Sequence, residues 1–254
     1  MPLAPLPDAD VEFVLAARRW VTPVVAELTL REVEQPIDFT AGQYVLLQDA
    51  ERRVPVRSYS VANAPRLDSS LSFLVTAVPG GATSIWLTRG ARVGERLLVS
   101  GPYGSFVADP AHAGPTIYLA GGSGLAPALS LVEAAIERGE AEDPAPARRH
   151  TLVFSGRTAQ DVIDEDRLRR LAVDHRGFDY VRTLTRVEEG EAEPLGRVPQ
   201  VLPSLVPDLS DHAVFVSGAP GFVDACTRAA QDLGVRPGRL ATEEFYAEPV
   251  PWRG

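Results

Sequence analysis

The stretch Thr116-Ile117-Tyr118-Leu119-Ala120-Gly121-Gly122-Ser123-Gly124-Leu125-Ala126-Pro127 decides the fold of the second half of this chain. Its first five residues form a short apolar run that is typical of a buried strand, and Leu125, Leu129, Val132 and Ile136 then follow helical spacing. The sequence therefore predicts a strand, a glycine-rich turn and a helix.

The turn itself permits two interpretations. Its glycines let the backbone approach a ligand closely, and the free amides and dipole at a helix start favour a phosphate. A tight strand-to-helix connection explains the same residues, and Pro127 fits the first turn of the helix in either case. The pattern is not the usual dinucleotide fingerprint, because Pro127 stands where a third glycine is expected. A P-loop is excluded because the chain has no lysine, and a nucleophile elbow because Leu125 replaces its last glycine.

The same rhythm of strand and helix continues after this unit. We expect strands at residues 151–154, 178–181 and 214–216, and helices at residues 160–172 and 221–233. Repeated strand–helix units predict a parallel sheet with helices on both faces. The stretch from Gly139 to Arg149 is rich in Glu, Asp, Ala and Pro and is predicted to be a loop.

Residues 11–107 have a different pattern. Apolar and polar residues alternate from Ala26 to Arg31, and Leu71, Phe73, Val75 and Ala77 fall on one face of a later strand. Several short strands separated by glycine and proline predict a small antiparallel barrel or sandwich. Breaks at Asp109-Pro110 and Gly114-Pro115 place the domains at residues 8–110 and 111–254.

Composition narrows the function classes. The net charge of −9 and the absence of a basic run are unfavourable for binding nucleic acid or an anionic membrane. No run of about 18 apolar residues occurs, and the first ten residues do not resemble a signal peptide, so we expect a cytoplasmic enzyme. One cysteine, Cys226, cannot hold an iron–sulfur cluster alone, and the four histidines lack ligand spacing, so no metal is expected.

Two motifs in the first half carry possible chemistry. In Arg57-Ser58-Tyr59-Ser60, the arginine can pair with a phosphate, and the tyrosine on the same strand face can stack on a flat ring. An ordinary strand also contains such a tetrapeptide. Gly80-Gly81-Ala82-Thr83-Ser84 is either a second phosphate cradle, with Thr83 or Ser84 capping a helix, or a hairpin turn that enters a capped helix.

Taken in order, these motifs resemble the ferredoxin–NADP reductase superfamily. Within it, the chain resembles the flavin reductase components of bacterial ring-hydroxylating dioxygenases and monooxygenases, without a fused [2Fe–2S] domain. The resemblance covers roughly residues 11–247. It is carried by residues 41–45, 57–60, 81–84, 94–95, 101–106, 121–127, 217–220 and 243–245.

The resemblance implies an antiparallel β-barrel that binds FAD, followed by an α/β parallel-sheet domain that binds NAD(P). It implies that Arg57 pairs with a flavin phosphate, with Ser58 beside it, that Tyr59 packs on the isoalloxazine, and that Ser60 hydrogen-bonds near its N5. The remaining implied contacts are Gly81, Ala82, Thr83 and Ser84 to the flavin diphosphate, Gly122, Ser123 and Gly124 to the nicotinamide nucleotide, Gly218 and Pro220 at the nicotinamide, and Phe245 or Tyr246 over a flavin face. The implied catalytic residues are Tyr59, Ser60, Ser217 and Glu243.

Two features depart from the family pattern. Ser217 stands where relatives have a cysteine beside the nicotinamide, which implies slower or less well aligned hydride transfer. The single cysteine implies that electrons leave to a separate acceptor. After the second predicted strand of the α/β half, Arg157 could pair with a 2′-phosphate, so both NADH and NADPH remain open, with NADH slightly favoured by the resemblance.

The expected function is therefore an FAD-dependent NAD(P)H oxidoreductase that passes electrons through the flavin to a separate ferredoxin or oxygenase. A free-flavin or ferric reductase carries the same motifs and is one alternative. A flavin-binding regulatory subunit with impaired hydride transfer, suggested by Ser217, is the other.

Overall fold

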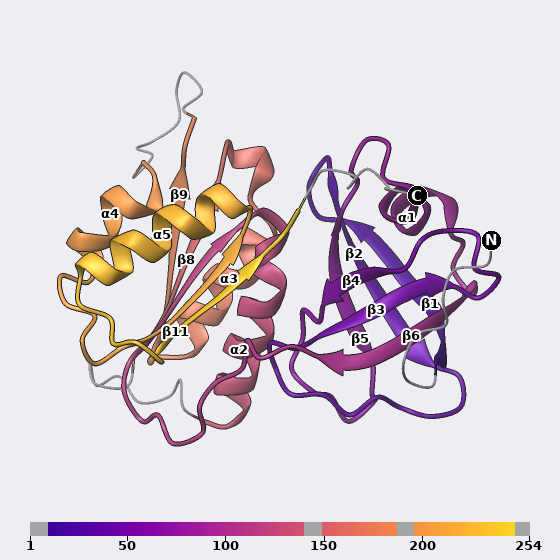
Figure 1. Cartoon of the computed structure of the whole chain (residues 1–254), viewed down its shortest axis with the longest axis horizontal. Helices are drawn as coiled ribbons and strands as arrows, with labels where there is room; N and C mark the ends of the chain where they lie inside the picture. The colour runs from indigo at the N-terminus through magenta and orange to yellow at the C-terminus, as the bar shows by residue number, and fades with distance from the viewer. Residues whose placement is uncertain (1–9, 140–148, 187–195, 247–254) are drawn as a thin grey trace.

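The computed structural model describes residues 10–139, 149–186 and 196–246. It shows two lobes side by side, one built from the first part of the chain and one from the second (Figure 1). Most of the loop predicted from Gly139 to Arg149 lies outside the described residues.

The first lobe is a curled antiparallel sheet of six strands in the order β4-β3-β6-β1-β2-β5. The backbone amide of Ala62 donates to the carbonyl of Ser72 at 2.7 Å, which draws the two end strands of the sheet together. The expected antiparallel barrel is confirmed. Its strands are β1 Val11–Trp20, β2 Val25–Glu32, β3 Tyr44–Asp49, β4 Arg57–Ser60, β5 Leu71–Thr76 and β6 Arg96–Tyr103.

Strand β5 shows why the barrel side chains alternate. Leu71, Phe73 and Val75 belong to the barrel core, as their spacing predicts. Leu74 points the other way and is also buried, because it packs against the second lobe. Both faces of β5 are therefore covered.

The second lobe is a parallel sheet of five strands in the order β11-β10-β7-β8-β9. On β7, Tyr118 and Ala120 share a core with helix α2, whereas Ile117 and Leu119 share one with helices α4 and α5. Helices therefore cover both faces, as predicted. The elements are β7 Thr116–Gly121, α2 Leu125–Glu137, β8 His150–Gly156, α3 Glu165–Asp174, β9 Phe178–Leu184, α4 Val198–Leu205, β10 Ala213–Gly218, α5 Pro220–Asp232 and β11 Leu240–Glu244.

Three elements of this lobe differ from the prediction. The helix expected over residues 160–172 begins at Glu165, because a short capped turn at residues 159–161 comes first. Helix α4 was not predicted; it contains Pro199 and Pro203. Strand β11 was not predicted as a strand, because none of its residues is buried and its sequence, LATEE, lacks an apolar run.

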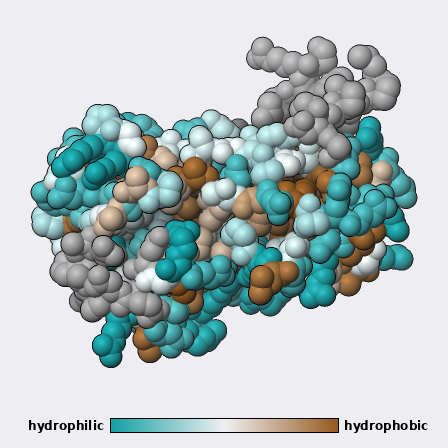
Figure 2. Space-filling model, turned by 90° about the horizontal axis from the view of Figure 1, so that it is seen from below, coloured by the Kyte–Doolittle hydropathy of each residue, from teal (hydrophilic) through white to brown (hydrophobic). Residues whose placement is uncertain are grey.

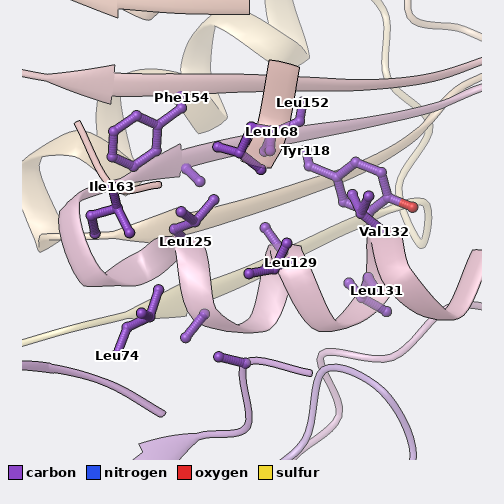
Figure 3. Packing of buried hydrophobic residues seen from close by; sticks show 14 of the residues in the cluster. Leu74, Tyr118, Leu125, Leu129, Leu131, Val132, Leu152, Phe154, Ile163 and Leu168 are labelled. Atoms are coloured by element: carbon purple, nitrogen blue, oxygen red, sulfur yellow. The ribbon is translucent and has the colours of Figure 1, made fainter. Parts of the chain in front are cut away.

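Helix α2 fixes the two lobes together. Figure 3 shows Leu74 of the barrel on one side of α2, with Leu152, Phe154 and Leu168 on the other. The buried hydroxyl of Ser130 on α2 accepts from the amide of Gly42 at 3.3 Å and donates to the carbonyl of Asn63 at 2.7 Å. Polar and apolar contacts thus hold the barrel against this face of the α/β lobe.

On the face in Figure 2, hydrophilic and hydrophobic residues are interspersed, and the hydrophobic ones gather in small groups. Among residues 10–139, 149–186 and 196–246, no helix is long and apolar enough to cross a membrane. The same ranges contain no group of three or more His, Cys, Asp or Glu side chains that could hold a metal ion.

Candidate active site

The register of the parallel sheet assembles one end of the site. Ser217 on β10 lies between Ala120 on β7 and Glu243 on β11. The glycine-rich turn that follows β7 therefore lies beside Ser217, and Glu243 lies one strand further along the sheet. Ligands of such sheets bind at the carboxyl ends of the strands, which is where these residues meet.

The turn packs tightly against β10 through Gly124. A Cβ on Gly124 would lie 2.5 Å from the carbonyl oxygen of Ser217 and 2.6 Å from the nitrogen of Gly218, so only glycine fits. Gly122 has a φ of +57°, and a Cβ at this position would have no other atom within 4 Å. Gly124 thus packs the turn against β10, and Gly122 leaves open space beside its Cα, which a phosphate site requires.

Ser217 is fully buried, and its hydroxyl donates to the carbonyl of Gly124 at 2.7 Å. Next to it, Gly218 has a φ of +154°, and a Cβ there would lie 2.9 Å from the ring of Phe222. Pro220 then begins helix α5. The end of β10 is therefore a second glycine turn that packs against the first.

The barrel contributes strand β4 to the same site. Ser60 is buried, and its hydroxyl donates to the carboxyl group of Glu243 across the interface between the lobes. Tyr59 is half-buried against the barrel core, and this burial raises the pKa of its phenol. Arg57 and Ser58 are exposed, and the Arg57 guanidinium donates to the carbonyl of Val56 at 2.8 Å.

Glu243 lies in an environment that disfavours the charged form of its carboxyl group. Burial raises the pKa of its carboxyl group, and the hydrogen bond from Ser60 opposes that rise. A carboxyl group becomes harder to ionise when water is removed from around it. The site therefore places a carboxyl group that is harder to ionise than usual directly against the motif strand of the barrel.

The expectation that Thr83 or Ser84 caps the next helix is wrong. Helix α1, Ala82–Ile85, has Gly81 at its N-cap, so both hydroxyl residues lie inside the first turn. The Thr83 hydroxyl donates to the backbone carbonyl of Pro55 at 2.5 Å, and the Ser84 hydroxyl donates to the backbone carbonyl of Gly81 at 3.1 Å. Because both side chains are buried and already bonded, the groups at this turn that suit a phosphate are backbone amides.

Arg157 follows strand β8 and pairs with Asp161 at 2.9 Å. The other carboxylate oxygen of Asp161 accepts from the amide of Thr158 at 3.0 Å and from its hydroxyl at 3.1 Å. The arginine considered for a 2′-phosphate is therefore already paired with a fixed carboxylate.

The end of the described chain also reaches this edge. The backbone amide of Phe245 donates to the carbonyl of Gly218 at 2.8 Å. This bond holds the half-buried Phe245 beside the second glycine turn. Tyr246 is 70% exposed, and its hydroxyl donates to Glu244 at 2.5 Å. Of the two aromatic candidates, Phe245 is the one whose backbone bonds to Gly218, a predicted site residue.

Sequence reasoning missed Thr76, at the end of β5. Its hydroxyl donates to the hydroxyl of Ser123 at 3.0 Å and so links the barrel to the glycine-rich turn. No motif marks this residue, because the contact exists only once the lobes are packed. Two cavities, of about 590 and 400 Å³, share His112 and Arg239 and lie near the amino ends of β10 and β11.

Comparisons with known proteins match both lobes. Residues 20–107 match the oxidoreductase FAD-binding domain family, and residues 118–228 match the oxidoreductase NAD-binding domain family. The residues at the site fit these groups, since Arg57 retains exposed donors and Gly122 faces open space. The chain thus carries an FAD-binding and an NAD-binding domain of the oxidoreductase type, and it spans a little under two thirds of the length of the first relatives that it matches.

The chain belongs to the ferredoxin–NADP reductase superfamily. It is 33% identical over 222 residues to the ferredoxin–NAD(P)⁺ reductase component of the naphthalene 1,2-dioxygenase/salicylate 5-hydroxylase systems of Ralstonia sp., covering 86% of this chain and 64% of that protein. It is 31% identical to the aromatic O-demethylase reductase subunit of Amycolatopsis sp., covering 95% and 75% respectively. The ferredoxin reductase in carbazole 1,9a-dioxygenase has a similar structure, with a TM-score of 0.81, 26% identity, and coverage of 96% of this chain and 71% of that one.

Proposed function

We propose that this chain takes electrons from NADH and passes them through FAD to a separate ferredoxin or oxygenase component. The observation that carries this proposal is the contact of Ser60 with Glu243, which joins the flavin-motif strand to the carboxyl ends of the α/β sheet. The similarity to reductase components of oxygenase systems supports the class of acceptor. The cytoplasmic location expected from the sequence, and the division of the domains at residue 110, remain part of this proposal.

FAD, when bound, supplies the ability to accept a hydride and to release its electrons to another centre. In the proposed arrangement, Arg57 pairs with a flavin phosphate and the amides at residues 82–84 bind the diphosphate. Tyr59 packs against the ring. Ser60 and Glu243 keep a hydrogen-bonded pair at the reacting edge, and Phe245 excludes water from it.

The α/β lobe would position the nucleotide. The backbone of Gly122, Ser123 and Gly124 would bind its diphosphate, and Gly218 and Pro220 would line the nicotinamide end. Fixing the nicotinamide and the flavin ring in one relative geometry supplies the proximity that hydride transfer needs. Because such transfer needs no general acid, no further ionisable pair is required.

The choice of NADH rests on Asp161. At the end of the second strand of a nucleotide-binding unit, a carboxylate suits a ribose 2′-hydroxyl, and an arginine suits a 2′-phosphate. Here the arginine is paired and the carboxylate is held by Thr158, so a 2′-phosphate would meet a fixed negative charge. This geometry favours NADH.

Iron–sulfur ligands for the next electron-transfer step must come from outside these 254 residues. The single cysteine, Cys226, is fully buried, and burial raises the pKa of its thiol to about 12. A group that resists ionisation and lacks partner thiols cannot ligate such a cluster. This supports an acceptor with its own redox centre.

An anaerobic titration of the flavin-reconstituted chain with NADH, and separately with NADPH, tests the proposal. We expect NADH to bleach the flavin absorbance at a rate of about 1 per second or faster, typical of an enzyme. Addition of an oxidised [2Fe–2S] ferredoxin should then restore the oxidised flavin faster than free FMN or ferric citrate does. Preference for the small acceptors would favour a free-flavin or ferric reductase. A bound flavin that neither nucleotide reduces would favour a regulatory subunit.

A further inference from the structure

The backbone of the glycine-rich turn receives a buried hydrogen bond from β10. Ser217 has no exposed surface, and its hydroxyl donates to the Gly124 carbonyl at 2.7 Å. Gly124 lies so close to β10 that a Cβ would overlap the Ser217 carbonyl. At this separation, a small hydroxyl fits between the strand and the turn.

The residue before Gly124 is held from the opposite lobe. The hydroxyl of Thr76, at the end of barrel strand β5, donates to the hydroxyl of Ser123 at 3.0 Å. Adjacent residues of the turn are thus bonded to two different lobes. Neither bond involves Gly122, at which a Cβ would meet no other atom within 4 Å.

We infer that Ser217 is a positioning residue, whose hydroxyl holds the glycine-rich turn for the nucleotide, with Thr76 holding the same turn from the barrel. This inference rests on the proposed function for the place of the nucleotide. In this role, Ser217 affects the nucleotide by holding the glycine-rich turn, without contacting the nicotinamide itself. This role also gives a physical reason for serine here, since a thiol is larger and a weaker donor.

Ser217→Ala and Thr76→Val each remove one of these bonds. A matched control is Thr183→Val, because Thr183 is also fully buried on the sheet and donates to a backbone carbonyl, that of Phe154, at 3.3 Å. We expect amide hydrogen exchange of residues 121–126, measured without nucleotide, to be roughly three- to tenfold faster in the two test variants, the factor that one hydrogen bond typically supplies. The control should leave this exchange unchanged.

The Kd for NAD⁺ should rise by a similar factor in both test variants, and more than the limiting rate of flavin reduction at saturating NADH falls. Ser217→Cys, which keeps the approximate size but weakens the donor, should lie between the parent and Ser217→Ala. It also carries the test if Ser217→Ala does not fold.

Unchanged exchange of residues 121–126 in every folded Ser217 variant would overturn the inference. So would a faster flavin reduction in Ser217→Cys with exchange unchanged, because that result places the side chain at the nicotinamide itself. Failure of the proposed function gives a different pattern. A chain that reduces no ferredoxin, yet shows the faster exchange and weaker NAD⁺ binding, would refute the acceptor and retain the role of Ser217.

Discussion

Ser60 and Glu243 lie 183 positions apart in the chain, and the hydroxyl of the first donates to the carboxyl group of the second. Strand β4 carries one and strand β11 the other, so this hydrogen bond joins the two lobes at the point where their motifs meet. Because protonation of the half-buried Glu243 side chain changes this hydrogen bond, the contact between the lobes depends on the protonation state of Glu243.

Replacing Glu243 with glutamine should change how stability depends on pH. Because burial raises the pKa of Glu243, the folded protein holds this proton at pH values where the unfolded chain, with an ordinary pKa near 4.5, has lost it. The stability that this group contributes is complete below pH 4.5 and is lost as pH rises through the raised pKa. Glutamine cannot ionise, so Glu243→Gln should become more stable relative to the parent as pH rises across that window.

The measurement is the free energy of unfolding in urea, taken from pH 4 upward to neutrality. The exposed Glu34 is a suitable control, since Glu34→Gln changes the same chemical group away from the site. A constant difference between Glu243→Gln and the parent over the whole range would contradict the prediction.

Replacement by alanine should have different effects at Gly122 and at Gly124. Gly124→Ala places a Cβ within 2.6 Å of the β10 backbone, so we expect a loss of roughly 2 to 4 kcal/mol in unfolding free energy. Gly122→Ala meets no atom within 4 Å and bears only the strain of its positive φ, about 1 to 2 kcal/mol. If Gly122 receives the nucleotide diphosphate, this milder variant should still bind NAD⁺ at least tenfold more weakly.

Chemical denaturation and calorimetric titration with NAD⁺ separate the two effects. Equal losses of stability in Gly122→Ala and Gly124→Ala would show that the turn is not packed as described. Unchanged NAD⁺ binding in Gly122→Ala would remove this glycine from the nucleotide site.

Arg57→Ala should weaken FAD binding without destabilising the flavin-free protein. The Arg57 guanidinium is exposed and donates to the carbonyl of its neighbour Val56, so its removal costs little in the absence of flavin. Loss of a charge-assisted phosphate contact should raise the Kd for FAD roughly 10- to 100-fold. Quenching of flavin fluorescence on binding measures this Kd.

Arg52→Ala is the matched control for that experiment. Arg52 is also an exposed barrel arginine, and it pairs with Asp10 at 3.1 Å. If Arg52→Ala weakens FAD binding as much as Arg57→Ala does, then the effect comes from the net charge of the barrel and not from a specific phosphate contact.

Local patterns predicted most of the architecture. The alternation at Leu71, Phe73 and Val75 and the apolar run at residues 116–120 each correspond to a strand, because their periods follow directly from backbone geometry. Strand β11 was not predicted because it forms through pairing with β10, and its own sequence LATEE has no strand pattern. Helix α4 was not predicted because it contains two prolines. Pro199 suits the first turn of a helix, but Pro203 in the interior is unfavourable, and burial of Val198 and Leu202 offsets that cost.

The site was predicted less completely than the fold, for a related reason. The motifs predicted Ser60, Ser217 and Glu243 as site residues, but which of their atoms face one another depends on the packing of two lobes. The bonds of Thr76 to Ser123 and of Ser217 to Gly124 have no local sequence pattern. The interpretation of Thr83 or Ser84 as a cap is wrong because a sequence does not show where a short helix begins.

The choice between NADH and NADPH should depend on the charge of Asp161. Its carboxylate is fixed by Arg157 and Thr158 beyond the end of β8, where a ribose 2′-substituent is expected. Asp161→Asn retains the size of the side chain, removes the negative charge and releases Arg157. The ratio of kcat/KM for NADPH to that for NADH should rise at least tenfold, as expected when a like charge near a phosphate is removed. Arg157→Ala, which leaves the carboxylate unpaired, should move the ratio the other way. If both variants keep the parent ratio in initial-rate assays, then these residues lie away from the ribose, and another part of the lobe selects the nucleotide.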